Sequence, residues 1–176
     1  MKILLDMVIS PNGYIAREDG SEDWLPEEGW EEFVKLAKNL NNVVMGRETY
    51  TQVTNRYKDY NFDSVPCKYK IIVTQNKKFQ APNGYRVVYS PEEAIQYLQS
   101  EDIENIFLIG GGKLNSEFMK KGLVNELQLT VNPYIIGKGR SFLAPANFEM
   151  PLKLVEHSEL PGGRIKLKYI VHKPKH

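Results

Sequence analysis

Short apolar runs alternate with helix-like spacings along most of the chain. The runs end at Gly, Pro or Asn turn residues, which predicts buried strands connected by helices. Predicted strands cover residues 2–9, 43–45, 70–74, 85–89 and 105–109, and predicted helices cover 29–39, a segment opening at 47, 90–99 and 113–121. Ser90, Pro91 and Glu93 are typical of a capped helix start. The first strand, 2–9, is expected to be buried on both faces.

The pattern changes after residue 125. Residues 126–134 alternate apolar and polar, and 152–160 and 164–172 read as strands around the turn Pro161-Gly162-Gly163. Helices between the earlier strands imply parallel pairing, whereas the late hairpin implies antiparallel pairing. The expected fold class is therefore α/β: a mostly parallel sheet with antiparallel C-terminal strands and flanking helices.

Composition narrows the function classes. The 176 residues, 41% hydrophobic and 26% charged, favour one globular domain over 1–176, and the net charge of +1 argues against a nucleic-acid binder. No apolar run is long enough to cross a bilayer, and Asp6 comes too early for a signal peptide. One cysteine, Cys67, excludes an internal disulfide, and the three histidines lack metal-ligand spacing. We expect a cytoplasmic protein without a metal site.

Two strand-to-helix turns are rich in glycine. Gly110, Gly111, Gly112 and Lys113 follow a buried strand and open a helix, where free N–H groups would attract a phosphate. The turn alone could also require these glycines. The segment lacks both the Walker pattern and the third Rossmann glycine. Gly46-Arg47 repeats the design at another strand end, and two such turns suit a dinucleotide.

Further polar groups leave alternatives open. Thr74 and Gln75, followed by Lys77 and Lys78, end a third strand and could hold a ribose or its 2′-phosphate, or form an ordinary polar loop. Acidic residues surround Trp30. They are either a solvated helix face, or one of them enters a pocket as a proton donor or a substrate anchor. The acids are Glu27, Glu28, Glu31 and Glu32.

Several segments in a fixed order resemble one family. They are 9–16 (I-S-P-N-G-Y-I-A), 23–25 (D-W-L), 44–50 (V-M-G-R-E-T-Y), 109–112 (I-G-G-G), and 123–127 followed by Pro133, Gly137 and Gly139. This set resembles the dihydrofolate reductase-like superfamily, closest to the reductase domain of bifunctional riboflavin-biosynthesis deaminase-reductases. The resemblance implies a three-layer fold around an eight-stranded sheet that binds NADPH across its strand ends.

The resemblance also implies roles for individual residues. Cofactor phosphates would lie at Gly46, Arg47 and Thr49, and at Gly110, Gly111, Gly112 and Lys113. The nicotinamide would be bordered by Val8, Ile15 and Ala16. Thr74 and Gln75 match the adenosine-ribose position, where NADPH-binding members often carry Ser/Thr followed by Arg. Gln75 departs from that pattern, and Lys77 or Lys78 could supply the missing charge.

The resemblance points less directly to the proton donor and to the residues that contact the substrate. Dihydrofolate reductases place a carboxylate four residues before a Phe on the first helix, and counting back from Phe33 reaches Gly29. Glu28 and Asp23 are the candidate acids instead. Asn12, Trp24 and Phe33 are expected to contact substrate, and the turn 10–14 to act as a flap over the nicotinamide.

The expected function is NADPH-dependent hydride transfer to a pterin- or pyrimidine-like heterocycle. The alternatives are an authentic dihydrofolate reductase and a non-catalytic NADP(H)-binding protein. A homodimer is expected by resemblance, and the apolar residues of 123–134 could extend a sheet or pack against the partner.

Overall fold

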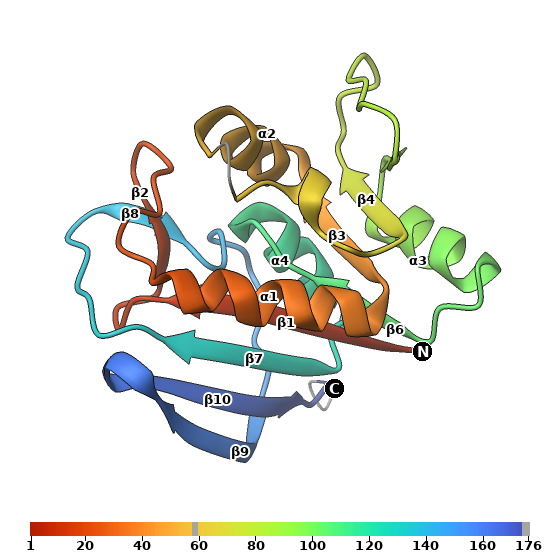
Figure 1. The fold of residues 1–176 in the computed structure, drawn as a ribbon. Helices are drawn as coiled ribbons and strands as arrows, with labels where there is room; N and C mark the ends of the chain where they lie inside the picture. The colour runs from red at the N-terminus through yellow and green to blue at the C-terminus, as the bar shows by residue number, and fades with distance from the viewer. Residues whose placement is uncertain (58–59, 174–176) are drawn as a thin grey trace.

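An eight-stranded sheet forms the middle layer of the protein (Figure 1). In the computed structural model, which describes residues 1–57 and 60–173, its order is β5-β4-β3-β6-β1-β7-β10-β9. The strands are β1 (Lys2–Ile9), β3 (Asn42–Gly46), β4 (Tyr69–Val73), β5 (Tyr85–Val88), β6 (Asn105–Leu108), β7 (Glu126–Val131), β9 (Leu152–Leu160) and β10 (Arg164–Val171). The first six strands in this order pair in parallel, whereas β10 is antiparallel to β7 and β9. The predicted fold class is confirmed.

Helices cover both faces of the sheet. Helices α1 (Glu27–Leu40) and α2 (Arg47–Arg56) share one apolar core with the short turn η1 (Phe62–Ser64). Helices α3 (Pro91–Ser100) and α4 (Gly112–Lys120) pack into the other core, on the opposite face. The Ser90 side chain accepts a hydrogen bond from the Glu93 N–H, as its sequence predicts.

The strand β1 differs from its expected burial. The buried residues, Ile3, Leu5 and Ile9, all lie on one face. Asp6 and Val8 on the other face are half-buried, because α1 packs over β3 and β6 and leaves the sheet beside them uncovered. The uncovered part of the sheet becomes the floor of a cavity.

Two short strands escaped the sequence analysis. β2 (Tyr14–Arg17) and β8 (Gly139–Ser141) form a small antiparallel sheet of their own. At four and three residues they are too short to show a period of two. Their pairing holds segments more than 120 positions apart and closes one end of the molecule (Figure 1).

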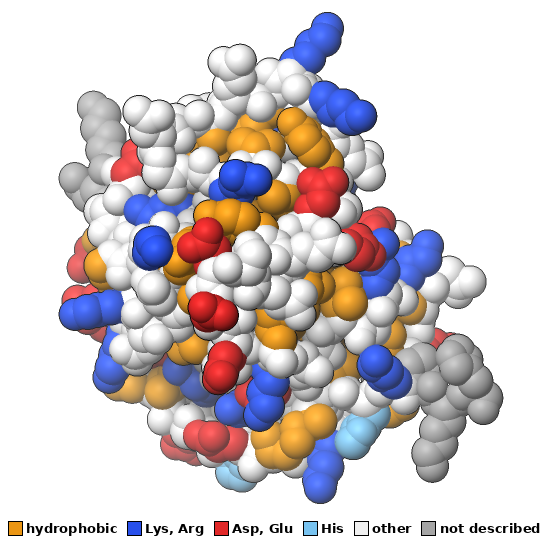
Figure 2. All heavy atoms as spheres, turned by 90° about the vertical axis from the view of Figure 1, so that its right-hand side faces the viewer, with side chains coloured by type: hydrophobic (Ala, Val, Ile, Leu, Met, Phe, Trp, Pro, Cys, Tyr) orange, Lys and Arg blue, Asp and Glu red, His pale blue; other side chains and the backbone are white. Residues whose placement is uncertain are grey.

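The surface carries mixed charge and scattered apolar side chains. On the face in Figure 2, Lys and Arg side chains are interspersed with Asp and Glu, and apolar side chains are visible in several places from the upper to the lower part of the view. Of the two alternatives for 123–134, the structure shows the first for the strand within it: β7 extends the sheet and is hydrogen-bonded on both sides, by β1 and β10. Within the described residues no helix is both long and apolar enough to cross a membrane.

Candidate active site

Three strand ends meet at one edge of the sheet. β4, β3 and β6 are parallel neighbours, so residues 74–75, 46–49 and 110–113 emerge side by side. The Gly46 N–H donates to the Gly110 carbonyl oxygen across 2.7 Å and ties the two glycine turns together. The structure thus brings together the three clusters that the sequence identified separately. An edge formed by the carboxyl ends of parallel strands is where α/β proteins commonly bind ligands.

Each glycine of the triple run has a packing reason. Gly110 has φ +100, and an added Cβ there would lie 3.3 Å from the Met7 side chain. A Cβ on Gly111 would lie 3.0 Å from Thr49 Oγ1, and one on Gly112 would collide with the Ser141 carbonyl oxygen. Turn geometry and packing therefore account for the run, and any argument for phosphate binding must rest on the helix ends.

Both helix starts at this edge leave backbone donors uncapped. α2 begins after Gly46 and α4 after Gly111, and neither helix has a side-chain hydrogen bond at its N-cap. The first N–H groups of a helix have no partner within the helix and carry partial positive charge. Two such ends held together by the Gly46–Gly110 bond fit the two phosphates of a dinucleotide.

The charged side chains at this edge differ in availability. Arg47 is half-buried in the first turn of α2 and forms no ion pair with a described residue. Lys113 lies 3.3 Å from Glu48 in an exposed ion pair, which contributes little. Thr74 is buried, and its hydroxyl accepts from the Asn76 N–H, whereas Gln75 is exposed. Arg47 is therefore the side chain best placed to receive an anion.

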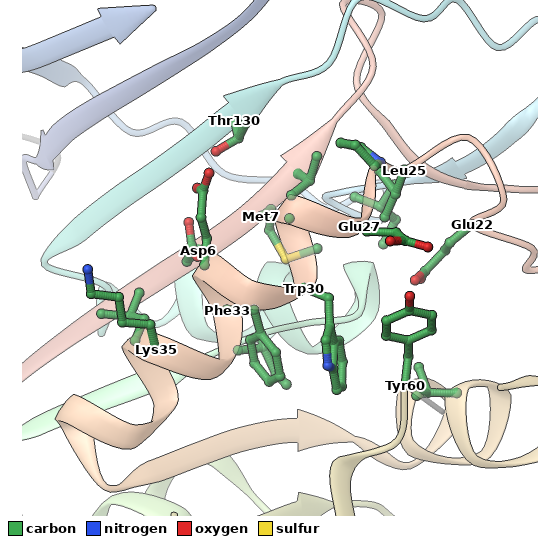
Figure 3. A pocket seen from close by; sticks show the side chains of 18 of the residues that line it. Asp6, Met7, Glu22, Leu25, Glu27, Trp30, Phe33, Lys35, Tyr60 and Thr130 are labelled. Atoms are coloured by element: carbon green, nitrogen blue, oxygen red, sulfur yellow. The ribbon is translucent and has the colours of Figure 1, made fainter. Parts of the chain in front are cut away.

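A cavity of about 680 Å³ lies between α1 and the sheet and reaches this edge (Figure 3). Strand residues such as Asp6 and Thr130 line one side, and the aromatic residues Trp30, Phe33 and Tyr60 line another. Its lining also includes Val8, Ile15 and Thr49, whereas Ala16 is buried outside the lining. Of the strand-end residues 46–49, 74–75 and 110–113, Thr49 belongs to the lining and the others lie outside it. The cavity is thus an aromatic chamber beside the strand-end edge, the form of site that binds a flat ring.

Asp6 is the carboxyl group at the floor of this chamber. Its Oδ1 accepts a hydrogen bond from Gln128 Nε2 at 3.0 Å. Loss of contact with water raises the pKa of Asp6 from 3.8 to about 6, and the Gln128 bond and the charge of Lys166 offset this only in part. Near neutral pH a fraction of the molecules therefore holds a proton here.

Glu22 is a second carboxyl group of this kind. It lines the cavity, and its side chain extends toward Tyr60 (Figure 3). Burial raises the pKa of Glu22 to about 7, against the opposing charges of Arg140 and Arg56. Its backbone N–H donates to the Tyr57 hydroxyl at 2.9 Å, which fixes this part of the loop.

The two acids expected from the sequence are poorly suited to donate a proton. Asp23 lies at the cavity, but Arg17 Nε donates to its Oδ1 at 2.8 Å and holds its pKa below the usual value. Asp23 thus stays charged at neutral pH. Glu28 is exposed and absent from the cavity lining, because it lies on the outer side of the first turn of α1. Neither placement supports the predicted role as an acid.

Of the three residues expected to contact the substrate, one lines the cavity and two do not. Phe33 lines the cavity, with its ring centroid 5.7 Å from that of Phe107. Trp24 is buried behind the lining, stacked on Tyr134. Asn12 is outside the lining, since it accepts from Ser10 Oγ and donates to the Ile136 carbonyl. Those bonds fasten the turn, so the structure supports neither substrate contact by Asn12 nor a flap.

Sequence analysis missed the polar floor of the cavity. Glu32 bridges two cations: Lys166 Nζ lies 2.8 Å from one carboxylate oxygen and Arg164 Nη1 lies 3.5 Å from the other. Asp6 had a detectable signal, since an acid in the middle of an apolar strand is unusual. The Glu32 contacts had none, because they join positions more than 130 residues apart. Within the described residues, no group of three His, Cys, Asp or Glu side chains could hold a metal ion.

Comparisons with known proteins agree with this architecture. Residues 1–166 match the sequence model of the RibD C-terminal domain. The protein YwjB of Bacillus subtilis (strain 168) is 29% identical over 178 residues, 96% of this chain and 97% of that protein. A putative riboflavin biosynthesis protein from Shewanella sp. PV-4 superposes with a TM-score of 0.82 at 21% identity, covering 98% and 100% of the two chains. Dihydrofolate reductase from Enterococcus faecalis, complexed with NADP(H) and RAB-propyl, has a TM-score of 0.71 at 18% identity, covering 98% and 97%. The fold is thus dihydrofolate reductase-like.

Proposed function

The chain belongs to the RibD C-terminal domain family, and we propose that it is an NADPH-dependent reductase of a pterin- or pyrimidine-like heterocycle. One observation carries the proposal: an aromatic chamber that holds a carboxyl group of raised pKa extends as far as Thr49, on the first turn of the helix that starts at the strand-end edge. Hydride transfer to a ring C=N or C=O needs those three features in one place.

The residues at the edge fit the cofactor. The uncapped starts of α2 and α4 would hold its phosphates, and Arg47 would add a bidentate contact. Val8 and Ile15 would border the nicotinamide, and Thr49 would lie beside the phosphates; all three line the cavity. The bound cofactor would supply the hydride. Gln75 carries no charge for a 2′-phosphate, so the exposed Lys77 and Lys78 would have to supply it, and on that basis we expect NADPH to be preferred over NADH.

Asp6 is the proposed proton donor. Gln128 occupies one of its carboxyl oxygens and leaves the other for a ring nitrogen of the substrate. Asp6 and Val8 share one face of β1, so they lie about 7 Å apart along the strand, within the span of one flat ring. Phe33 and Trp30 would orient that ring and exclude water.

Calorimetric titration with NADPH, with NADH in parallel, tests the cofactor half of the proposal. We expect tight NADPH binding and weaker NADH binding. Oxidation of NADPH, followed by absorbance, would then be screened with dihydropterins, dihydrofolate and aminopyrimidines. Absence of binding to either cofactor would refute the reductase proposal. Tight binding without turnover of any of these compounds would favour the non-catalytic alternative.

We further propose that two copies of the chain pair through the β9–β10 hairpin. β9 ends the sheet, so its outer edge is open to another strand. Leu154, Val155 and Ile165 on this hairpin are between 43% and 46% exposed, which is unusual for large apolar side chains on adjacent strands. Light scattering after size exclusion should give twice the chain mass, and Leu154→Asp should give the monomer mass. A monomeric wild-type protein would refute the pairing.

A further inference from the structure

The protonation of Asp6 depends on charged groups that lie on other elements. We propose that Glu32 is a positioning residue for the acid of the proposed reaction: it holds the Lys166 ammonium group away from Asp6 and so keeps the proton on the Asp6 carboxyl group. This role rests on the proposed function, in which Asp6 donates a proton to the substrate. The hold of Glu32 on Lys166 is a property of the folded chain, so it can be measured without a substrate.

Glu32 is the carboxylate that Lys166 contacts. Lys166 Nζ donates to Glu32 Oε2 at 2.8 Å, and the Lys166 side chain is 27% exposed, so water screens this pair only in part. Glu32 lies on α1 and Lys166 on β10, and both line the cavity. Arg164 Nη1 lies 3.5 Å from the other carboxylate oxygen, and Arg164 is buried. Contacts to both oxygens thus hold the Glu32 carboxylate in place.

Lys166 is also within reach of Asp6. Lys166 pairs with Thr130 across β10 and β7, and Thr130 pairs with Val8, two positions after Asp6 on β1. Two strand spacings and one two-residue step place the Cα atoms of Lys166 and Asp6 about 12 Å apart on one face of the sheet. An extended lysine and an aspartate can close that distance together. Released from Glu32, the Lys166 ammonium group can therefore turn toward Asp6.

Glu32 and Lys166 act on the Asp6 proton in opposite directions. Burial raises the pKa of Asp6 to about 6, and the hydrogen bond from Gln128 lowers it in part. Two charges add smaller effects: Lys166 lowers the pKa of Asp6, and Glu32 raises it. Glu32 therefore favours the protonated form of Asp6 in two ways, through its own charge and by holding the opposing cation.

The other charged side chains on this face are paired or screened. Lys168 Nζ on β10 lies 3.1 Å from Glu126 on β7, and Lys2 Nζ on β1 lies 3.7 Å from the same carboxylate. Lys35 on α1 is exposed, so water screens its charge. β6, the neighbour of β1 on its other side, has the sequence N-I-F-L and carries no charged side chain. Among the described residues, Lys166 is thus the cation best placed to act on the carboxyl group at the cavity floor.

Titration of the Asp6 carboxyl carbon by NMR measures the effect in the protein without ligands. The Asp6 signal is identified by its absence from Asp6→Asn. Glu32→Gln keeps the shape of the side chain and should lower the Asp6 midpoint by roughly half a pH unit or more, whereas Lys166→Met should raise it. Glu31→Gln makes the same change of charge on an exposed neighbour outside the cavity lining, and should leave the midpoint unchanged.

The directions of these shifts decide the question. An Asp6 midpoint that stays constant or rises in Glu32→Gln would overturn the proposal. A midpoint that stays constant or falls in Lys166→Met would do the same, and this result stands even if Glu32→Gln does not fold. In the Lys166→Met background, Glu32→Gln should shift the midpoint by less than in the wild-type protein, because there is no ammonium group to release. An equal shift in both backgrounds would refute the hold on Lys166.

Kinetics separate failure of this role from failure of the proposed function. The pH above which kcat falls should move with the Asp6 midpoint in Glu32→Gln and in Lys166→Met. If the midpoints move as expected but kcat keeps its pH dependence, Asp6 is not the proton donor. If no compound is reduced, the reductase proposal fails. In both cases the shifted midpoints still show that Glu32 keeps the proton on Asp6.

Discussion

Replacing Asp6 by Asn tests the raised pKa at the centre of the site without knowledge of the substrate. The change keeps the shape of the side chain, and the Asn oxygen can still accept the hydrogen bond from Gln128 Nε2. It removes the one property that the cavity disfavours, which is the negative charge of an ionised carboxyl group. The variant should therefore be more stable than the wild-type protein at neutral pH and less active.

The magnitude follows from the pKa. Asp6 titrates at about 6 in the folded chain against 3.8 for the ordinary group. The difference of about 2 pH units corresponds to at most about 3 kcal/mol, since cavity water screens part of it. Because the folded chain binds the proton more tightly, the contribution of Asp6 to stability falls as pH rises from about 4 to about 6. The Asn variant lacks this fall.

Urea unfolding of both proteins at pH 4, 5, 6 and 7 measures the effect. The unfolding free energy of Asp6→Asn minus that of wild type should rise by up to about 3 kcal/mol across this range. Asp23→Asn is the matched control: Arg17 lowers the pKa of Asp23, so that group titrates at and below the acid end of this range, and its difference should not rise between pH 4 and 7. A difference for Asp6→Asn that stays constant with pH would refute the reasoning.

Other predictions concern catalysis, the cofactor and packing. Once a substrate is found, kcat should fall above pH about 6, because the protonated Asp6 is the active form. Asp6→Asn should lower kcat by roughly 10²–10⁴-fold and abolish this fall of kcat with pH, whereas Glu22→Gln should leave the fall unchanged. Arg47→Ala should weaken NADPH binding by roughly 10–100-fold in calorimetry, whereas Arg56→Ala at the other end of α2 should not; equal effects would contradict the proposed phosphate contact. Gly112→Ala should lower unfolding stability by about 1–3 kcal/mol because its methyl group collides with Ser141, while Gly137→Ala, which meets open space, should be neutral; a tolerated Gly112→Ala would contradict the packing argument.

The sequence determined most of the secondary structure and the strand-end clusters. Hydrophobic spacing, the Ser90 cap and the glycine turns act within a few residues, so they can be read locally. Parallel pairing followed from helices between the strands and placed residues 46–49, 74–75 and 110–113 at one edge. The short strands β2 and β8 were missed because three or four residues carry too little pattern.

Only the tertiary structure decided which acids and cations form the chamber. Asp23 and Glu28 were the acids expected from the sequence, but Arg17 holds Asp23 ionised and Glu28 faces solvent. Asp6 became the candidate acid because α1 leaves this part of the sheet uncovered. The charge pairing in the site depends on the position of β10 beside β7, which places Lys166 next to Glu32. Proton affinity and charge pairing depend on burial and distance, and both are set by contacts between residues far apart in the chain.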